Sequence, residues 1–527
     1  MPDHPSDSTL PSSAGHPAAD VSDRRPSAST ATPRSDTTRS DTPRSDTTPT
    51  DTTPAPREAL GASVVAVIGF LAFVEFTSGI IQGYYTPLFT DIARFLGIHD
   101  ADMNWPEGTQ LMLSAIVIPV FAKLGDMIGH KRLLVISIAL TAVAAVVLAT
   151  SHSFPVYLAA WTFMGCYATW LPLEIALVWS RSRGRANPAS VTRLAAGVLV
   201  AALETGAITG ALLAGALADA GWPVPALLWI PAGAIIACFF VVWFGVGETP
   251  DLAGGKFDTG GTVLITLALL ALTGGLSLLR LLGPGSVWAW LAVGVGLGLV
   301  YPFVRYELRH PDPLIDVRMF TNPALWPVFA TAGFFGVSVL GAQTPLSTFA
   351  RTDPALGYGL GATSGQTSIL IGAYVFSLVV GALLFPLVTK WIAPRIALIG
   401  ATVMVGIGYL SFLPFHGSYS QVLTNMIIAG IGSGALVAAL PATAAAAAPA
   451  HATGQATGLT NSVKTLGGAV ASCVFGIALL QAVDAGGGGT TAGSFTGYVT
   501  VWILCGVTAL VAAVLLLFVP KQAFSDK

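Results

Sequence analysis

Long apolar runs recur along the chain from Leu60 onward, and they constrain its fold more than any other feature. Each run is about twenty residues long, the length that an α-helix needs to cross the ~30 Å hydrocarbon core of a bilayer. The sequence is 53% hydrophobic and 10% charged, which leaves more apolar surface than a soluble chain of this length buries. We expect an all-α integral membrane protein with about 14 transmembrane helices, at 60–85, 107–122, 133–151, 154–179, 194–218, 224–246, 259–279, 286–304, 323–345, 364–389, 396–414, 421–443, 457–482 and 497–519.

The first 57 residues have a different composition. They are rich in Ser, Thr, Pro and Asp, and RSDTT, RSDTP and RSDTT follow one another between Arg34 and Thr48. Because such a segment lacks the apolar content to form a core, we expect a disordered polar tail in the cytoplasm. A regulatory or partner-binding role for the tail is the alternative. The first apolar run would then act as an uncleaved insertion signal.

Basic residues in the short connections predict the orientation of the chain. Cytoplasmic connections carry an excess of Lys and Arg, and a cytoplasmic N-terminus gives that distribution over the predicted spans. We therefore expect a multi-pass protein of the cell membrane with both termini in the cytoplasm, including the C-terminal residues 521–527. The inner connections hold Lys131, Arg132, Arg181, Arg183, Arg185, Arg193, Lys256, Arg305, Arg309, Arg318, Lys390 and Arg395, and the outer ones hold Arg94, Arg280 and Arg351.

Several functional classes are not supported by the sequence. The net charge is −2, which gives no reason to expect a nucleic-acid partner. No glycine-rich phosphate loop with a lysine and no H-E-x-x-H pattern is present, so we expect neither an enzyme nor a bound cofactor or metal. The four cysteines lie inside apolar runs and are interpreted as small buried side chains; they are Cys166, Cys238, Cys473 and Cys505.

The short connection LGDMIGHKR, Leu124–Arg132, packs an acid, a turn glycine and a basic cluster between two spans. It resembles the signature loop that follows the second helix in the major facilitator superfamily, roughly G-x-L-[AG]-D-[RK]-x-G-[RK]-[KR]. Ala122 replaces the leading glycine, and Met127 and His130 replace basic residues. The resemblance implies a conformational latch that holds two halves together in one state of the transport cycle, formed by Asp126, Gly129, Lys131 and Arg132.

An internal echo indicates two related halves. The segment 385–395 aligns loosely with 122–132, with Leu387 at the place of Leu124 and Arg395 at the place of Arg132. Repeated halves are typical of secondary transporters. We expect an N-terminal six-helix bundle at 58–246, an inserted helix pair at 247–310 and a C-terminal six-helix bundle at 311–520. This organisation resembles the fourteen-helix drug:proton antiporter branch of the superfamily, as do the segments 221–231, 310–320 and 454–468.

The fifth span carries a second motif of that branch, G-x8-G-P-x2-G-G. Gly197, Gly206 and Gly210 keep its spacing, while Ala207 replaces the proline and Ala211 the last glycine. Small residues along one face let helix backbones approach closely in a membrane. The resemblance implies a close-packed, bending helix that limits leakage; an ordinary tight helix interface is the alternative.

Span four departs from the superfamily at one informative place. Trp161 occupies the position of a buried arginine that the resemblance links to proton coupling. Candidate coupling groups are Glu204, Glu75 and Glu174, because an ionisable residue in a bilayer is costly and needs a reason. The alternative is a structural carboxyl with a polar partner, which for Glu174 is an arginine of the inner connection. Lys464, near the inner end of span thirteen, is expected to snorkel.

These features favour a secondary active transporter. We expect it to act as a monomer that exports a hydrophobic or amphipathic small molecule, such as a drug, antibiotic or secondary metabolite, by proton antiport. A metabolite uptake symporter and a transport-inactive membrane sensor or scaffold are the alternatives. A substrate cavity is expected at Gln82, Tyr85, Gln343 and Asn425, although membrane aromatics also serve as interface anchors.

Overall fold

The computed structural model describes residues 56–182, 188–247, 257–311, 313–448, 453–480 and 491–519. Residues Met1–Pro54 and Ala55–Lys527 separate into two units, and the fold concerns the second of these. The predicted polar tail up to Ala55 lies outside the described residues, as do Arg183, Arg185, Lys256 and the C-terminal residues 521–527.

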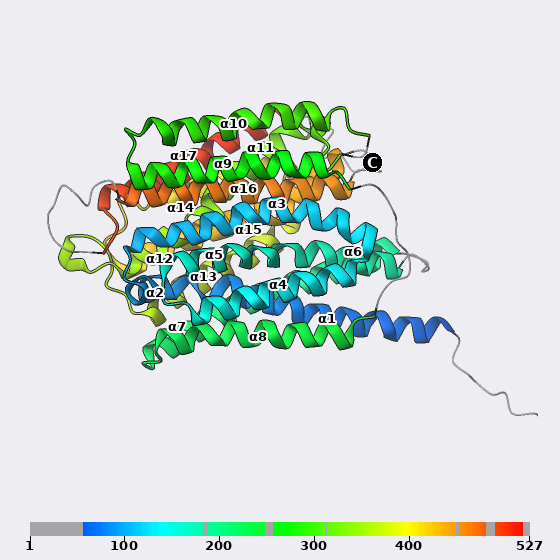
Figure 1. Ribbon diagram of the computed structural model, residues 1–527, viewed down its shortest axis with the longest axis horizontal. Helices are drawn as coiled ribbons and strands as arrows, with labels where there is room; N and C mark the ends of the chain where they lie inside the picture. Colours follow the sequence, from blue (N-terminus) through cyan, green and yellow to red (C-terminus); the bar gives the residue numbers. More distant parts are fainter. Residues whose placement is uncertain are drawn as a thin grey trace, which may run out of the picture. The chain divides into compact units, whose positions relative to one another are not determined.

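The described residues form a bundle of long helices (Figure 1). Within these described residues, twelve helical segments are long and apolar enough to cross a membrane. A thirteenth span consists of α5, η3 and α6 in succession, and α14 is the fourteenth. The expected all-α membrane fold with about 14 spans is therefore confirmed. The elements are α1 (Pro56–Tyr84), η1 (Thr86–Leu88), α2 (Phe89–Leu96), η2 (Asp100–Met103), α3 (Asn104–Ile128), α4 (His130–Thr150), α5 (Phe154–Met164), η3 (Gly165–Thr169), α6 (Trp170–Ser182), α7 (Pro188–Asp219), α8 (Val224–Gly245), α9 (Thr259–Leu282), α10 (Val287–Glu307), η4 (Val317–Thr321), α11 (Trp326–Gly336), η5 (Val337–Gly341), α12 (Gln343–Arg351), η6 (Pro354–Leu356), α13 (Ser364–Val388), α14 (Pro394–Leu410), α15 (Tyr419–Ala447), α16 (Thr453–Leu480) and α17 (Phe495–Leu516).

Span four is interrupted in its middle by the 3₁₀ turn η3. The cause is a close approach of Gly165 to α3, where a side chain at this position would overlap the carbonyl oxygen of Gln110. Backbone groups freed inside a membrane need new partners. Ser114 Oγ donates to the carbonyl of Gly165 at 2.9 Å, and Ser137 Oγ donates to that of Cys166 at 2.9 Å.

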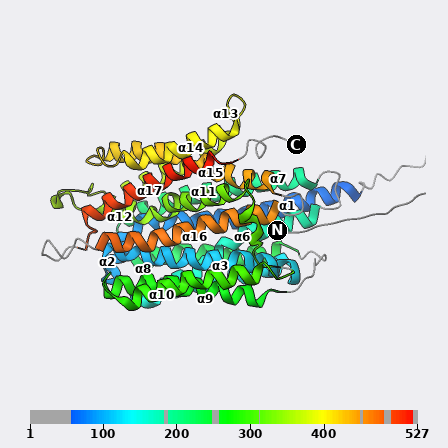
Figure 2. The same ribbon diagram turned by 90° about the horizontal axis from the view of Figure 1, so that it is seen from above.

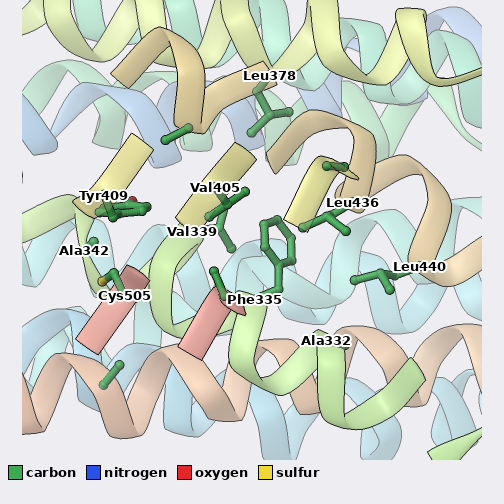
Figure 3. Close-up of a cluster of buried hydrophobic side chains, with 14 of the residues drawn as sticks. Ala332, Phe335, Val339, Ala342, Leu378, Val405, Tyr409, Leu436, Leu440 and Cys505 are labelled. Atoms are coloured by element: carbon green, nitrogen blue, oxygen red, sulfur yellow. The ribbon is translucent and has the colours of Figure 1, made fainter. Parts of the chain in front are cut away.

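Span nine is interrupted by the π-helical turn η5, which leaves a carbonyl that the surrounding core satisfies. The hydroxyl of Tyr409 in α14 donates to the Ser338 carbonyl at 2.6 Å. Tyr409 lies in the same apolar cluster as Phe335, Val405 and Leu436 (Figure 3). Single π-turns inside α-helices are frequent at functional sites. Regular α-helix is thus interrupted in span four by a 3₁₀ turn and in span nine by a π-turn.

Buried apolar side chains form two large clusters. One is built from residues between Val67 and Val246, and the other from residues between Met319 and Val519 together with Ala101. We name the helices that contribute to these clusters the N-half (α1–α8) and the C-half (α11–α17). The remaining pair, α9 and α10, packs together, and α9 also contacts α3 and α16 (Figures 1 and 2).

The two halves meet along two helix pairs, α3 with α16 and α7 with α13. Glycines bring these helices together: a side chain at Gly108 of α3 would overlap Cys473 Sγ of α16 at 2.7 Å, and one at Gly215 of α7 would overlap Ser368 of α13. We call the end of the bundle that carries Gly129 the motif end, and the end that carries Asp91 and Asp219 the opposite end.

Helices α1 and α7 pack through reciprocal glycines. A side chain at Gly79 or Gly83 of α1 would overlap the carbonyl oxygens of Leu203 and Ala207, and a side chain at Gly206 would overlap that of Phe76. Gly210 follows one turn later, where an added Cβ would lie 3.0 Å from Ile80 Cα. This is small-residue packing in a membrane, and it shows which helix the predicted glycine face of span five contacts.

We predict that Gly206→Leu impairs the packing of α7 on α1, whereas Gly197→Leu does not. Gly197 belongs to the same motif but has open space where its side chain would lie, so it is the matched control. Overpacking a tight contact costs about 1–3 kcal/mol. Thermal unfolding of the purified protein in detergent should show a lower midpoint for Gly206→Leu alone. Equal midpoints for the two variants would contradict the role assigned to this packing.

Candidate functional site

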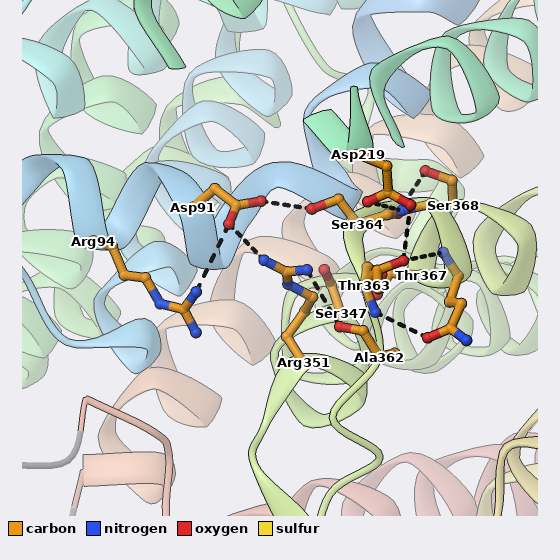
Figure 4. Close-up of polar contacts among 12 residues, drawn as sticks. Asp91, Arg94, Asp219, Ser347, Arg351, Ala362, Thr363, Ser364, Thr367 and Ser368 are labelled. Atoms are coloured by element: carbon orange, nitrogen blue, oxygen red, sulfur yellow. Dashed lines mark hydrogen bonds and ion pairs between the residues drawn. The ribbon is translucent and has the colours of Figure 1, made fainter. Parts of the chain in front are cut away.

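Asp91 joins the two halves at the opposite end (Figure 4). It lies on α2 and accepts hydrogen bonds from two residues of the C-half, from Arg351 Nη2 at 2.5 Å and from Ser364 Oγ at 2.7 Å. The side chain of Arg351 is 10% exposed and that of Asp91 is 22% exposed. Because this pair is largely shielded from water, it contributes more to holding the halves together than an exposed pair would.

Asp219, the last residue of α7, makes a second connection at the same end. Its carboxylate accepts from Thr363 Oγ1 at 2.9 Å and from the Gly365 amide at 3.1 Å (Figure 4). A carboxylate at a helix N-terminus is favoured by the helix dipole, and α13 begins at Ser364. A third contact runs from Ser347 Oγ to the Thr86 carbonyl at 2.5 Å. Both halves are therefore tied together at the opposite end by long-range pairings that sequence periodicity does not predict.

The predicted latch residues lie at the motif end. Asp126 is in the last turn of α3 with a half-exposed side chain, 3.5 Å from Nε2 of His130. Gly129 turns the chain between α3 and α4 with φ 105°, a conformation that favours glycine. Lys131 Nζ donates to the Trp243 carbonyl near the end of α8 at 3.3 Å, and Arg132, the last of the predicted set, is the third residue of α4.

The C-half repeats the contact made by Lys131. Arg395, which the sequence aligns with Arg132, donates from Nε to the Leu516 carbonyl of α17 at 3.1 Å and from Nη2 to the Leu517 carbonyl. In each half, a basic residue after a span thus binds carbonyls at the end of that half's last helix. Cations are favoured at helix C-termini, which gives the internal echo a physical basis.

Glu75 and Glu174 face each other inside the N-half. Glu75 lies on α1 and Glu174 on α6, and both are fully buried at 0% exposed. The two carboxyl groups act on each other electrostatically, and none of their four oxygens has a hydrogen-bond donor among the described residues. The one described arginine of the inner connection near Glu174, Arg181, donates to the Gly247 carbonyl, and Arg183 and Arg185 lie outside the described residues.

Trp161 fills the place of the absent arginine with an aromatic cluster. Its indole Nε1 donates to Gln110 Oε1 at 2.8 Å. Its ring lies against those of Tyr85, Tyr157 and Phe89, with centroids 4.7, 5.6 and 5.8 Å away. The polar end of the indole is therefore satisfied and its apolar body is packed, which is how a buried Trp is normally accommodated.

Glu204 lies near the middle of α7, and its charge interacts with that of Lys464 on α16. These helices belong to different halves. Glu204 also acts electrostatically on Tyr374 of α13, whose hydroxyl donates to Ser433 Oγ at 3.3 Å. Lys464 is half-buried on α16, and the expectation that it snorkels stays a prediction.

The four predicted cavity residues are each held by local contacts. Tyr85 is buried against Trp161, and Gln82 Nε2 lies 3.5 Å from Ser78 Oγ on the same helix. Gln343 Nε2 donates to the Val339 carbonyl of the π-turn at 3.0 Å. Asn425 Nδ2 donates to the Phe415 carbonyl at 2.7 Å, so a structural bond accounts for it. A role of these residues in binding substrate stays a prediction.

The family is shown by comparison with known sequences. The model of the Major Facilitator Superfamily matches residues 71–472, and the chain belongs to this superfamily. It is thus a multi-pass membrane transporter rather than an enzyme.

Relatives include a probable actinorhodin transporter of Streptomyces coelicolor, 27% identical over 71% of this chain and 65% of that protein. The chain thus spans just under two thirds of that relative. The drug efflux pump JefA of Mycobacterium tuberculosis is 26% identical over 82% of this chain and 81% of its own length. The quinolone resistance protein NorB of Staphylococcus aureus is 28% identical over 55% and 60%.

Solved transporters share the fold. The POT family transporter PepTSo superposes with a TM-score of 0.61 at 13% sequence identity, covering 88% of this chain and 99% of that one. The nucleoside transporter NupG superposes with a TM-score of 0.59 at 12% identity, covering 86% and 99%.

We predict that charge reversal at Asp91 opens the opposite end. Asp91→Arg places two guanidinium groups together and removes the acceptor for Ser364, so the closed arrangement should lose about 1–3 kcal/mol relative to the open one. Labelling of a cysteine introduced at Ser347 by a membrane-impermeant reagent measures the change. Labelling should rise about 5- to 150-fold and return toward wild type in the double variant Asp91→Arg/Arg351→Asp. Unchanged labelling in the single variant would refute the assignment.

Proposed function

We propose that the protein exports a hydrophobic or amphipathic small molecule from the cell in exchange for protons. The observation that carries this proposal is the set of glutamates placed mid-helix inside the bundle, Glu75, Glu174 and Glu204. A carboxyl group in a membrane interior is costly, and in transporters such groups mark ion and proton pathways. The names of the relatives, which describe antibiotic transport and drug efflux, support the substrate class.

The carboxyl pair supports proton binding more directly than a single acid would. The carboxyl oxygens of Glu75 and Glu174 have no hydrogen-bond donor among the described residues, so nothing there stabilises a charge on both groups at once. Their shared site is fully buried, and like charges there would repel strongly. Among the described residues, the pair also acts on Cys238 of α8 and Tyr167 of η3, and neither is a cation. The pair therefore holds one proton and releases it when its surroundings change.

The bonds at the opposite end support a direction for the cycle. With both termini in the cytoplasm, the motif end faces the cytoplasm, and the Asp91–Arg351 and Asp219–Thr363 contacts close the extracellular side. Substrate would then enter from the cytoplasmic side, and rocking of the two halves would expose it outside. The two apolar clusters support a division into an N-terminal bundle (58–246) and a C-terminal bundle (311–520), with the inserted pair at 247–310 packed beside α3 and α16.

Inside-out membrane vesicles test the function. A proton gradient, acidic inside, should drive uptake of a fluorescent amphipathic drug such as ethidium into these vesicles. Dissipating the gradient with a protonophore should abolish that uptake. Glu204→Gln and Glu75→Gln mimic the protonated carboxyl and should each lower proton-driven uptake at least tenfold, while equal expression serves as the control. Uptake only into right-side-out vesicles would identify a symporter, and no transport of a broad drug panel would favour a sensor or scaffold.

Asp126 is proposed to act as the latch of the motif end once that end closes. When that end closes, the Asp126 carboxylate leaves His130 and interacts with a helix end. A carboxylate in favourable helix-end geometry stabilises that state by about 0.3–1 kcal/mol. Asp126→Asn should therefore slow export about two- to fivefold at unchanged expression, and Asp126→Glu should retain most activity. Full activity of Asp126→Asn in the vesicle assay would show that the latch lies elsewhere.

A further inference from the structure

The last turns of α10 border a pocket at the motif end that the proposed transport cycle does not use. Arg280, in the last turn of α9, donates from Nε to Asp102 at the start of α3 at 2.9 Å, so α9 ends at the opposite end. Helix α10 returns from there, and its last turns lie at the motif end. The pocket measures about 470 Å³, a volume typical of small-ligand sites. Residues between 301 and 311 line it, among them Tyr301, Arg305, Tyr306, Arg309 and His310.

Two arginines give this pocket its charge. Arg305 and Arg309 are four residues apart and therefore lie on one face of the helix. The guanidinium of Arg305 lies over the ring of Tyr301, 5.9 Å from its centroid, and its Nη1 donates to the Tyr301 hydroxyl at 3.4 Å. Among the residues that the structure describes, no carboxylate forms an ion pair with either arginine. The pocket thus carries two positive charges without a carboxylate partner in this part of the chain.

The acids at the same end of the pair are turned away from the arginines. Asp258 and Glu307 are both buried, at 1% exposed, and a side chain at Gly261 of α9 would overlap an oxygen of each. The Gly261 amide donates to Asp258 Oδ1 at 2.8 Å. His310 lies at the border of the two regions, with Nδ1 3.9 Å from Asp258 Oδ2. Negative charge is therefore held between α9 and α10, and positive charge lies on the outer side of α10.

The arginines are not required to cap the helix. Cations are favoured at a helix C-terminus, and Arg318 has that position here, since its Nη2 donates to the Leu308 carbonyl at 2.9 Å. Basic residues also mark cytoplasmic connections, but that role needs only their charge and no pocket. The pocket, its two arginines and its aromatic rings call for a further explanation.

An exposed apolar face leads from the bundle surface to this pocket. Helices α9 and α10 lie at the edge of the bundle in both views (Figures 1 and 2). Leu297 lies one turn and Trp290 three turns before Tyr301 on α10, and all three side chains are more than half exposed. In a membrane such a face contacts lipid chains, and a tyrosine at its end lies at headgroup level. A molecule that fills both regions has apolar chains joined to an anionic group.

We propose that this pocket binds the headgroup of an anionic phospholipid from the leaflet at the motif end. Arg305 and Arg309 bind the phosphate oxygens, because the planar guanidinium suits phosphate, and the acyl chains lie along the exposed face of α10. Basic pockets at the ends of membrane helices are recognition sites for such lipids. The inserted pair thereby holds a lipid at its outer side. The inference does not depend on the direction, the substrate or the driving ion of transport.

The test is lipid binding by the purified full-length protein, measured by native mass spectrometry. Phosphatidylglycerol should bind roughly tenfold or more tightly than phosphatidylcholine with the same acyl chains, because each arginine contributes roughly fivefold. Raising the ammonium acetate concentration should reduce this preference. Arg305→Gln/Arg309→Gln should abolish it. Arg193→Gln/Lys390→Gln, which removes two exposed cations of the motif end outside the pocket, is the matched control and should keep it.

Thermal unfolding in lipid-free detergent checks that both double variants fold, and their exposed side chains predict unchanged midpoints. Equal binding of the two lipids by the wild type overturns the site, as does a preference that salt does not reduce. An equal loss in both double variants would identify a general effect of charge and also overturn it. Glycerol phosphate should bind about tenfold or more weakly than the lipid, because it has no acyl chains to bury. Equally tight binding of this soluble probe would make the pocket a site for free phosphate compounds and refute the lipid assignment.

Discussion

The cost of placing a charge or an unpaired backbone group in a membrane governs this structure. Helices satisfy their own backbone groups, which explains why the apolar runs become helices. The same cost applies where the α-helix is interrupted. The carbonyls freed at η3 and η5 accept hydrogen bonds from Ser114, Ser137 and Tyr409. It also isolates the few interior carboxyl groups. Glu75 and Glu174 are the clearest case, because none of their four oxygens has a hydrogen-bond partner among the described residues.

Three interior acids lie in two different settings. Glu75 and Glu174 lie together within one half, on α1 and α6, and their carboxyl oxygens have no hydrogen-bond donor among the described residues. Glu204 lies on α7, which packs against α1 of its own half and α13 of the other. A rigid-body motion of the halves leaves the first setting intact and changes the second. In the cycle we propose, the surroundings of Glu204 therefore change when the halves rock, whereas those of the buried pair change only with rearrangements inside the N-half.

The sequence predicts the spans well because bilayer thickness sets their length and composition. It predicts a face of small residues on span five from Gly206 and Gly210. It does not predict that α1 packs against this face, because any helix with glycines of its own could pack there. The breaks at Gly165 and in span nine are not visible, because 3₁₀ and π turns keep the same apolar composition as the flanking helix. The Asp91–Arg351 contact joins residues 260 positions apart, and Glu174 has a partner on another helix. Pairings of this kind are determined by tertiary packing, which periodicity does not report.

Trp161 shows how the N-half fills its interior without a cation. Its ring packs against those of Tyr85, Tyr157 and Phe89, and its nitrogen donates a hydrogen bond to Gln110. An indole at this place adds packing but no charge, so it cannot compensate a carboxylate in the same half. The charge of such a carboxyl group then depends on how the surrounding helices pack around it. In the cycle we propose, this dependence converts the motion of two rigid halves into a change in proton affinity.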